Sequence, residues 1–458
     1  MGCPNTGGRI IIIGAGPTGL GAAYRLNELG YENWALYEKE ATIGGLSSSF
    51  VDEKGFTWDI GGHVMFSGID KFNELVDVLL GDDFVSHNRE SWIRMSGRWI
   101  PYPFQNNVRH LPRQALLDCL LGLIRAQRGV GLAANFEDWI LQTFGQGIAE
   151  HFMLPYNFKV WAYPVHMMDY GWIAERVSVV DVERILKNVV MDLDDTGWGP
   201  NNRFKFPLHG GTGGLFQRFE PFVRENLYRR VKPVGIDMDS RMIAFDDGKT
   251  ERYDHLINTS PLDQFVKLLR SRREDTARLQ AHAETLAYNG VHIIGIGLQK
   301  RIEGSKCWVY FPEEHIPFYR LTYFSHYSPN NVPHGDTENF SSLSCEVSFS
   351  GFKPVREEDV ISETIRGLIQ AGIIAEEDKA SILSTWHYRV DHAYPIPTIE
   401  RDSNLRAIQT VLERNHIHSR GRFGAWKYET GNMDHSVMMG MEVINHILYE
   451  TRERIWTL

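Results

Sequence analysis

The sequence has few of the features that mark secreted, metal-binding or membrane proteins. Its 458 residues include only four cysteines, and no two of these form a CxxC pair. This scarcity argues against a disulfide framework and a zinc site, and it favours a reducing compartment, which we predict to be the cytoplasm. The longest apolar stretch, residues 10–23, is interrupted by glycines and falls short of the ~20 residues that span a membrane.

Basic charge is not in excess, since 48 Lys and Arg face 58 Asp and Glu for a net charge of −10. This balance argues against a generic nucleic-acid-binding protein but allows a local basic pocket for a small anion. Residues 1–8 carry neither the basic region nor the apolar run of a signal peptide. They match the myristoylation pattern with Gly2 and Thr6, but Pro4 is unfavourable there, so we expect no lipid anchor.

The motifs of several enzyme classes are missing as well. HExxH, GxSxG and GxxxxGK[ST] do not occur, and the histidines do not cluster at metal-ligand spacing, so we predict no metal site. The chain does have enough apolar material, 43% of its residues, for a sizeable core. Its length is typical of two or three domains.

The first clear unit is a strand, a glycine-rich turn, a helix and a second strand. Residues 10–13 are four isoleucines, which is typical of a strand buried on both faces. Apolar residues then recur at helical spacing, Gly30 ends the helix, and residues 34–37 form the second strand. We expect the two strands to be parallel neighbours in a βαβ unit.

The rest of the chain changes character along its length. Helices are predicted at 136–144, where Asn135 is the N-cap, and at 357–370 and 436–449. A stripe of Leu116, Leu117, Leu120, Leu121 and Ile124 is expected to face the core. Strands are predicted at 232–245 (two strands), 256–259 (returning to the first sheet), 291–298, 307–311, 318–324 and 342–349.

Residues 14–19, GAGPTG, carry a dinucleotide-binding signature in the context that its mechanism requires. Gly14 allows the tight turn, Gly16 lets the backbone approach a pyrophosphate, and Gly19 lets the helix pack closely on the strand. The pyrophosphate is expected on the helix N-terminus, in the turn that contains Thr18. Glu38 follows Gly19 by 19 residues and is predicted to bind the adenosine ribose and to disfavour NADP.

Further glycines indicate that the dinucleotide is FAD. Gly44, Gly45 and Leu46 follow the ribose acid, as in FAD-binding members of this fold rather than NAD-binding ones. Residues 59–63, with Gly61, Gly62 and His63, provide backbone that can pass close to a flavin ring, and His63 is expected near that ring. Residues 210–214, GGTGG, lack the Lys of a phosphate loop and predict a close backbone crossing near the cofactor.

These patterns predict an α/β protein of three domains. A discontinuous Rossmann-like FAD-binding domain comprises residues 1–84, 205–290 and 418–458. A helical domain comprises residues 108–197. An antiparallel β-sheet domain for the substrate comprises residues 85–107, 198–204 and 291–417.

Several longer stretches closely resemble the eukaryotic-type UDP-galactopyranose mutases over nearly the whole chain. The matching stretches are GAGPTGLGAA (14–23), DIGGHVMFS (59–67), PYPFQNN (101–107), PYNFKVWA (155–162), ERV (175–177), WGPN (198–201), GGTGG (210–214), YFPEEHIPFYR (310–320), HAYPIPT (392–398), SRGRFGAWKYETGN (419–432) and DHS (434–436). The resemblance implies an isomerase that interconverts UDP-galactopyranose and UDP-galactofuranose. In that family N5 of reduced FAD attacks the anomeric carbon, UDP leaves and returns, and no net oxidation occurs.

The resemblance also implies partners and site residues. NADPH or NADH is the implied reductant and a UDP-sugar the implied partner, with no nucleic acid and no membrane; whether the chain forms a homo-oligomer stays open. The implied catalytic residues are His63, Arg176 and Arg320, and the two arginines would bind the diphosphate. The other implied contacts are Tyr310, Tyr394 and Tyr428 for phosphate oxygens, Tyr102, Phe104 and Gln105 for uracil, Asn157 and Trp161 near the ribose and substrate channel, Asn201 for the sugar, and Arg89, Ser91, Arg422 and Asn432 around the cofactor.

The sequence departs from the fungal members at two points that the resemblance places near the flavin. Gly68 stands where they carry His, and Met433 stands where they carry Gln. Three alternatives remain open beside the galactose mutase: a mutase for another UDP-sugar, an FAD-dependent oxidoreductase of the amine-oxidase type, and an inactive UDP-sugar-binding protein.

Overall fold

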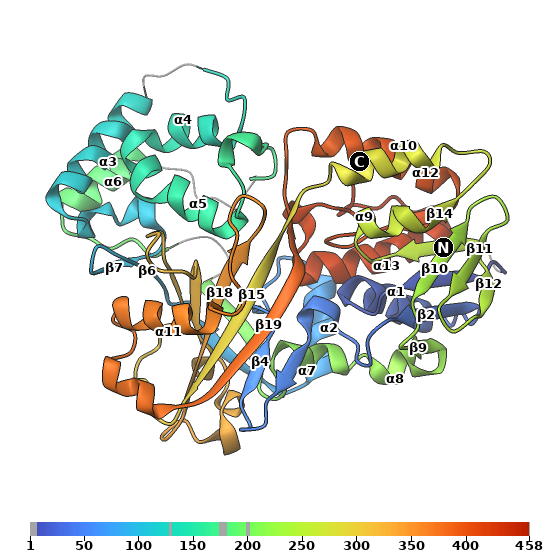
Figure 1. Ribbon diagram of the computed structural model, residues 1–458, viewed down its shortest axis with the longest axis horizontal. Coiled ribbons are helices and arrows are strands. Elements are labelled where there is room, and N and C mark those ends of the chain that lie inside the picture. Colours follow the sequence, from blue (N-terminus) through green and yellow to red (C-terminus); the bar gives the residue numbers. More distant parts are fainter. Residues whose placement is uncertain (1–6, 128–130, 174–180, 198–201, 458) are drawn as a thin grey trace.

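The computed structural model describes residues 7–127, 131–173, 181–197 and 202–457, and it is the α/β protein that the sequence predicts. Figure 1 shows its parts side by side. The two termini of the described chain and the first βαβ unit lie on one side, and a group of helices lies on the other. Two long strands, β15 (Tyr288–Leu298) and β19 (Ile382–Pro395), run between them.

A five-stranded parallel sheet forms around the four isoleucines of β1 (Ile10–Ile13). Its order is β20-β13-β1-β2-β9, so the predicted βαβ pairing of β1 with β2 (Trp34–Glu38) is confirmed. The predicted return of the chain to this sheet is confirmed by β13 (His255–Asn258), which pairs parallel with β1. The other members are β9 (Leu227–Arg229) and β20 (Ile417–Ser419).

The isoleucines alternate between two cores, as the two-residue period of a strand requires. Ile10 and Ile12 pack against the helices of one face, whereas Ile11 and Ile13 pack against the other face; all four are buried. The first face is covered by α1 (Pro17–Glu28), α2 (Asp70–Leu80), α7 (Gly211–Gln217), α8 (Glu220–Val223) and α13 (Met433–Tyr449). The second is covered by a small sheet of β10 (Pro233–Asp237), β11 (Met242–Phe245), β12 (Thr250–Arg252) and β14 (Leu269–Arg270), with α9 (Leu262–Phe265), α10 (Thr276–Glu284) and α12 (Arg401–Arg414).

Helices α1 and α13 touch through their backbones. A Cβ atom placed on Gly440 would lie 2.0 Å from the carbonyl oxygen of Thr18, and one placed on Gly21 would lie 2.1 Å from that of Val437. Only glycine permits such an approach, because no side chain separates the helices. The first helix of the unit is therefore held by the last helix of the described chain.

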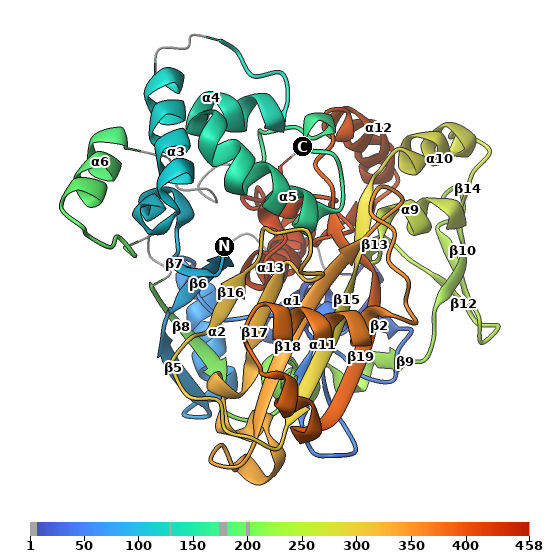
Figure 2. The ribbon, with the colours of Figure 1, turned by 60° about the vertical axis from the view of Figure 1, so that its left-hand side comes forward.

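A seven-stranded sheet forms the other large layer, in the order β19-β15-β18-β17-β16-β6-β7 (Figure 2). It is antiparallel except where β16 runs parallel to β6. Helix α11 (Val360–Gln370) covers one face, onto which the even-numbered residues of β15, such as Ile294 and Ile296, are directed. The remaining strands are β6 (Ser91–Met95), β7 (Arg98–Pro101), β16 (Trp308–Tyr310), β17 (Arg320–Tyr323) and β18 (Ser341–Phe349), and two small sheets pair β3 (Ser49–Val51) with β4 (Thr57–Asp59) and β5 (Phe84–Asn88) with β8 (Arg203–Pro207).

The helical part consists of α3 (Arg113–Ala126), α4 (Phe136–Ile148), α5 (Leu154–Trp161) and α6 (Val182–Val190). Asn135 caps α4 as predicted, because its side chain accepts a hydrogen bond from the amide of Asp138. The expectation that the leucine stripe of α3 faces the core is wrong in part, since Leu117, Leu121 and Ile124 are exposed. The helix instead turns Cys119, Gly122 and Leu123 inward, where the small Gly122 lets the backbone of α4 come close.

No helix among the described residues is both long and apolar enough to cross a membrane.

The contact between α1 and α13 yields a prediction about stability. Gly440→Ala should lower the free energy of unfolding by about 1–3 kcal/mol, because a backbone carbonyl cannot move aside for the new methyl group. Gly235→Ala, in β10, is the control: a Cβ there meets no atom within 4 Å. Denaturant titration of both variants decides the point, and equal stabilities would contradict it.

Candidate functional site

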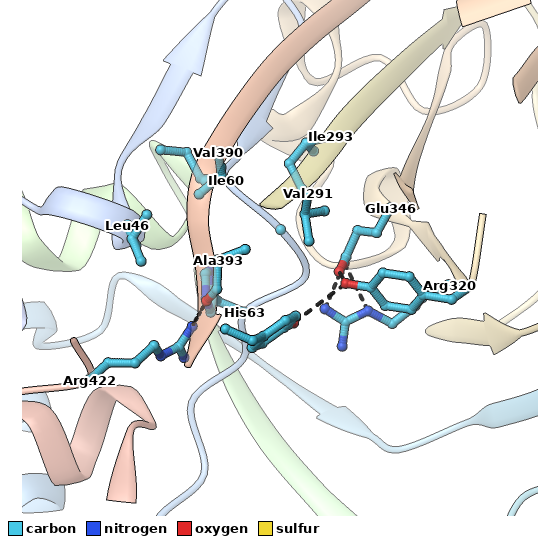
Figure 3. A pocket seen from close by; sticks show the side chains of 13 residues that line it. Leu46, Ile60, His63, Val291, Ile293, Arg320, Glu346, Val390, Ala393 and Arg422 are labelled. Carbon is cyan, nitrogen blue, oxygen red and sulfur yellow. Dashed lines mark hydrogen bonds and ion pairs between the residues drawn. The ribbon is translucent and has the colours of Figure 1, made fainter. Parts of the chain in front are cut away.

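A pocket lies where the loops that follow the first βαβ unit meet the open face of the seven-stranded sheet, and its empty space of about 350 Å³ includes open solvent. Figure 3 shows aliphatic side chains on one side and charged groups on the other. The lining residues are Leu46, Ile60, Gly61, His63, Val291, Ile293, Tyr319, Arg320, Glu346, Val390, Ala393, Tyr394 and Arg422.

One row of side chains crosses the sheet at the floor of this cavity. Arg320 on β17 lies directly opposite Tyr310 on β16 and directly opposite Glu346 on β18. Cross-strand partners share a face of the sheet, with Cβ atoms about 5 Å apart. Pairing of the strands thus sets a phenol, a guanidinium and a carboxylate side by side.

Glu346 accepts several hydrogen bonds in this row, and it is only 2% exposed. Its Oε1 accepts from Nε of Arg320 at 2.8 Å, from Nη2 at 2.6 Å, and from the amide of Gly62 at 3.0 Å. Its Oε2 accepts from the hydroxyl of Tyr319. Burial alone would lower the pKa of Arg320, but the carboxylate of Glu346 together with Tyr394, Tyr319 and Tyr310 outweighs it and holds that pKa well above its usual value.

Neither Glu346 nor Tyr319 was among the residues that the sequence predicted for the site. Tyr319 is part of the stretch that resembles the mutase family, immediately before Arg320. The signal for Glu346 is weaker: it is the one acid in residues 341–349, SSLSCEVSF, an otherwise small and apolar strand. A lone acid in such a strand is buried only when it has a partner.

The glycine-rich segments near α1 form a backbone cradle. The amide of Gly44 donates to the carbonyl of Ala15 at 2.8 Å, and a Cβ on Gly45 would lie 3.0 Å from the Cα of Gly16. Glu38 accepts from the amides of Ala15 and Glu40 at 2.7 and 2.9 Å, which fixes its carboxylate at the end of β2. Burial raises the pKa of Glu38 above its usual value. Each carboxylate oxygen retains a lone pair for a ribose hydroxyl.

The GGTGG segment holds the base of the loop that enters the cavity. It forms the first turn of α7, and the amide of Thr212 donates to both carboxylate oxygens of Asp59 at 3.1 Å. A Cβ on Gly211 would lie 2.3 Å from Oδ1 of Asp59, so the approach needs glycine. Burial raises the pKa of Asp59 to about 6, although the bonds from Ser49 and Thr212 oppose this. The segment therefore anchors residues 59–63 rather than binding a phosphate through a lysine.

His63 presents an unpaired ring nitrogen to the cavity. Its Nδ1 is shielded from solvent and has no hydrogen-bond partner among the described residues. Burial, together with the nearby charges of Arg422 and Arg320, lowers the pKa of His63 to about 3. The imidazole is accordingly neutral near pH 7, and a bound group is needed to satisfy Nδ1.

A second cluster of predicted residues lies at the mouth of the helical part. Trp161 meets Tyr428 edge-on with ring centroids 4.7 Å apart, and Tyr394 lies 5.6 Å from Tyr428. Arg422 donates to the carbonyls of Gly431 at 2.8 Å and Ala393 at 3.4 Å, and its guanidinium lies 5.7 Å from the ring of Tyr394. These contacts join β19, α5 and the segment after β20.

The guanidinium of Arg89 is held between two aromatic rings, 5.0 Å from the centroid of Tyr102 and 5.1 Å from that of Trp308. Its Nε donates to Oγ of Ser91 at 2.8 Å. The ring of Tyr102 also lies 5.1 Å from that of Tyr310, which connects this cluster to the Arg320 row. These contacts place Arg89 and Ser91 beside Tyr102, and their predicted role around the cofactor stays a prediction.

The remaining predicted residues are placed as follows. Phe104 is fully buried and stacks on Phe152 at 4.4 Å, and Gln105 beside it is 4% exposed. Asn157 donates to the carbonyl of Met153 at 2.8 Å, and Asn432 is the N-cap residue of α13. Arg176 and Asn201 lie outside the described residues. No group of three metal-binding side chains occurs in the described part of the chain.

Comparison with known proteins identifies relatives at two levels. The family model of the NAD(P)-binding Rossmann-like domain matches residues 12–79. A solved structure of reduced UDP-galactopyranose mutase is 45% identical in sequence, covers 96% of this chain and 94% of its own, and superposes with a TM-score of 0.93.

More distant structures share the fold alone. A putative protoporphyrinogen oxidase from Exiguobacterium is 16% identical with a TM-score of 0.71, over 97% of this chain and 99% of its own. Wild-type putrescine oxidase bound to putrescine is 15% identical with a TM-score of 0.66, over 96% and 98%. At these identities the likeness concerns the architecture, which is that of the predicted α/β class.

The buried imidazole gives a prediction about acid stability. An unfolded His63 takes up a proton near pH 6.5, whereas the folded residue does so near pH 3. The depressed pKa contributes stability that is present above pH 6.5 and is lost as the pH falls toward 3. Between pH 6.5 and 4 the wild type should lose about 3 kcal/mol more than His63→Gln, which cannot titrate. Denaturant unfolding across this range is the measurement, and parallel pH profiles would contradict the assignment.

Proposed function

The chain belongs to the UDP-galactopyranose mutase family, and on this premise we propose that it interconverts UDP-galactopyranose and UDP-galactofuranose without net oxidation. The observation that carries the proposal is the position of Arg320, with its partner Glu346, on the wall of the cavity that His63 and Leu46 also line. A cation for a diphosphate thus faces the segments predicted to hold a flavin. An amine oxidase has no use for a diphosphate clamp of arginines and tyrosines.

FAD is the proposed cofactor, and three features of the described residues fit it. The backbones of Gly16 and Gly45 approach as closely as a pyrophosphate cradle requires, beside the N-terminus of α1. Glu38 is fixed at the end of β2, and His63, whose buried Nδ1 has no partner among the described residues, lines the cavity. Bound and reduced, FAD would supply the nucleophile for the anomeric carbon; NADPH or NADH is the proposed reductant.

Arg320 is proposed to bind the diphosphate of the substrate. Its Nε and Nη2 are occupied by Glu346, so the remaining N–H groups of the planar guanidinium are the ones available to phosphate oxygens. The negative charge on the diphosphate grows as the glycosidic bond breaks. A fixed, desolvated guanidinium therefore stabilises the transition state more than the bound substrate.

The other predicted contacts complete the proposal. Tyr310, Tyr394 and Tyr428 would donate their hydroxyls to phosphate oxygens, and Tyr102 would support the uracil. Arg176 and Asn201 are proposed for the diphosphate and the sugar by resemblance. The cysteines of the described chain, Cys119, Cys307 and Cys345, are free and buried, which supports the proposed location in the reducing cytoplasm.

The reaction should need a reduced flavin but consume no reductant. One equivalent of dithionite per flavin should support many turnovers of UDP-galactofuranose to UDP-galactopyranose, and the oxidised protein should be inactive. Chromatography of the nucleotide sugars measures both states. Stoichiometric use of reductant or uptake of oxygen during turnover would favour the oxidoreductase instead. Related UDP-sugars in the same assay test the choice of sugar.

Removing Arg320 should weaken both binding and turnover. Each charge-assisted hydrogen bond contributes roughly 1.5–3 kcal/mol, which corresponds to about ten- to a hundred-fold in kcat/KM. We expect Arg320→Ala to lose at least ten-fold, with FAD retained and a normal flavin spectrum. Arg320→Lys should recover only part, because an ammonium cannot reproduce the planar fork.

Two further variants distinguish the loss of the Arg320 cation from the effect of leaving Glu346 unpaired and from the effect of removing any arginine. Arg320→Ala leaves Glu346 buried without its cation, so Arg320→Ala/Glu346→Gln shows how much of the loss comes from that bare carboxylate. Arg301→Ala removes an exposed ion pair with Glu338 and should leave kcat/KM unchanged. If Arg320→Ala retains near-normal kcat/KM, the diphosphate lies elsewhere.

A further inference from the structure

A buried lysine lies at the centre of the loop that joins Tyr310 to Arg320. Lys159, on α5, is only 5% exposed. Its Nζ lies 2.8, 2.9, 2.7 and 2.9 Å from the backbone carbonyl oxygens of residues 311, 313, 316 and 318. All four belong to the loop between β16, which ends at Tyr310, and β17, which begins at Arg320.

The ammonium has no carboxylate partner within ion-pair distance among the residues that the structure describes. Its charge is instead offset by four carbonyl dipoles that point at it, and its three protons are shared among four acceptors. Burial lowers the pKa of Lys159 well below its usual value. A buried charge of this kind is tolerated only while every one of its hydrogen bonds is made, so the loop and the lysine fix each other.

The contacts of Lys159 reach both ends of the loop. The amide of Phe311 donates to the carbonyl of Tyr319 at 3.0 Å, which closes the loop directly above the Tyr310–Arg320 pair. The carbonyl of Lys159 itself accepts a hydrogen bond from Ser348 on β18, the strand that carries Glu346. In Figure 2, α5 lies over the ends of these strands. One residue, through its side chain and its backbone carbonyl, thus ties the helical part to the three strands that build the Arg320 row.

From this geometry we infer that Lys159 is a positioning residue for the diphosphate-binding groups. It does not touch the substrate; it gathers the 311–319 loop around its ammonium and so sets where Tyr310 and Arg320 stand. Without the cation, the buried carbonyls of Phe311, Ile316 and Phe318 would lose the lysine as a partner, and the loop would have to open to hydrate them. The carbonyl of Glu313 would keep its hydrogen bond from the amide of Ile316 at 3.3 Å. Arg320 and Tyr310 would then lose their fixed geometry. The inference about the substrate rests on the proposed function, whereas the inference about the loop does not.

The experiment compares holoenzyme carrying Lys159→Met with the wild type. Hydrogen exchange followed by mass spectrometry should show faster exchange in peptides covering residues 311–319, with β1 and α1 unchanged. Calorimetric titration with UDP should show at least a ten-fold weaker affinity, with FAD content preserved. Lys353→Met is the matched control: this half-buried lysine also donates to a backbone carbonyl, that of Ser348 at 2.6 Å, and within the described part of the chain it makes no hydrogen bond to the loop.

A double-mutant cycle distinguishes positioning from a general loss of stability. If Lys159 acts through the loop ends, its effect on UDP affinity should shrink to about three-fold or less in an Arg320→Ala background. An undiminished effect in that background overturns the inference, as does unchanged exchange in residues 311–319. Unfolding or loss of FAD in Lys159→Met also overturns it, because the lysine would then support the fold at large. Failure of the wild type to bind UDP would refute the proposed function, while the exchange result still decides the role in the loop.

Discussion

A single carboxylate, that of Glu346, joins the two walls of the cavity. It accepts from Arg320 on the substrate side and from the amide of Gly62 on the side of the predicted flavin segment. A buried charge that loses its partner costs about 3–5 kcal/mol, so the carboxylate cannot release the guanidinium without a replacement. Neither wall can therefore shift alone. The geometry of the loop at residues 59–63 and the position of Arg320 depend on the same pair of charges, and Asp59 fixes the base of that loop from the other end.

The regular parts of the fold were predictable because their patterns are local. Four consecutive isoleucines marked β1, and the glycines around it marked the turn and the cradle. The 14-residue β19 was not predicted, because its exposed and half-buried positions mix polar and aromatic residues without a clean alternation. The prediction that the leucine stripe of α3 faces the core was wrong in part for the opposite reason. Its leucines are regular, yet the core side of that helix is decided by Gly122, whose lack of a side chain admits α4.

The site was predictable only where a motif or a resemblance named a residue. His63, Leu46, Arg320, Tyr394 and Arg422 were expected, and all line the cavity. Their roles toward substrate and cofactor stay predictions. The groups that hold them in place were not expected, because support of this kind comes from strand register and loop closure. Glu346 holds Arg320 because it is the cross-strand partner of Arg320 on the neighbouring strand. Lys159 holds the loop because its ammonium contacts four backbone carbonyls that lie far from it in the sequence. Neither relation is visible in the order of residues.

The order in which the parallel sheet is assembled has a consequence for biosynthesis. The first strand and helix are translated long before β13, β20 and α13, which cover or extend them. Until then β2 and α2 are the main native partners of β1 and α1, and the rest of their apolar surface lacks its cover; such surfaces aggregate when left exposed. The cradle at Gly16, Glu38 and Gly45 therefore has its full support only once the chain has been translated through α13.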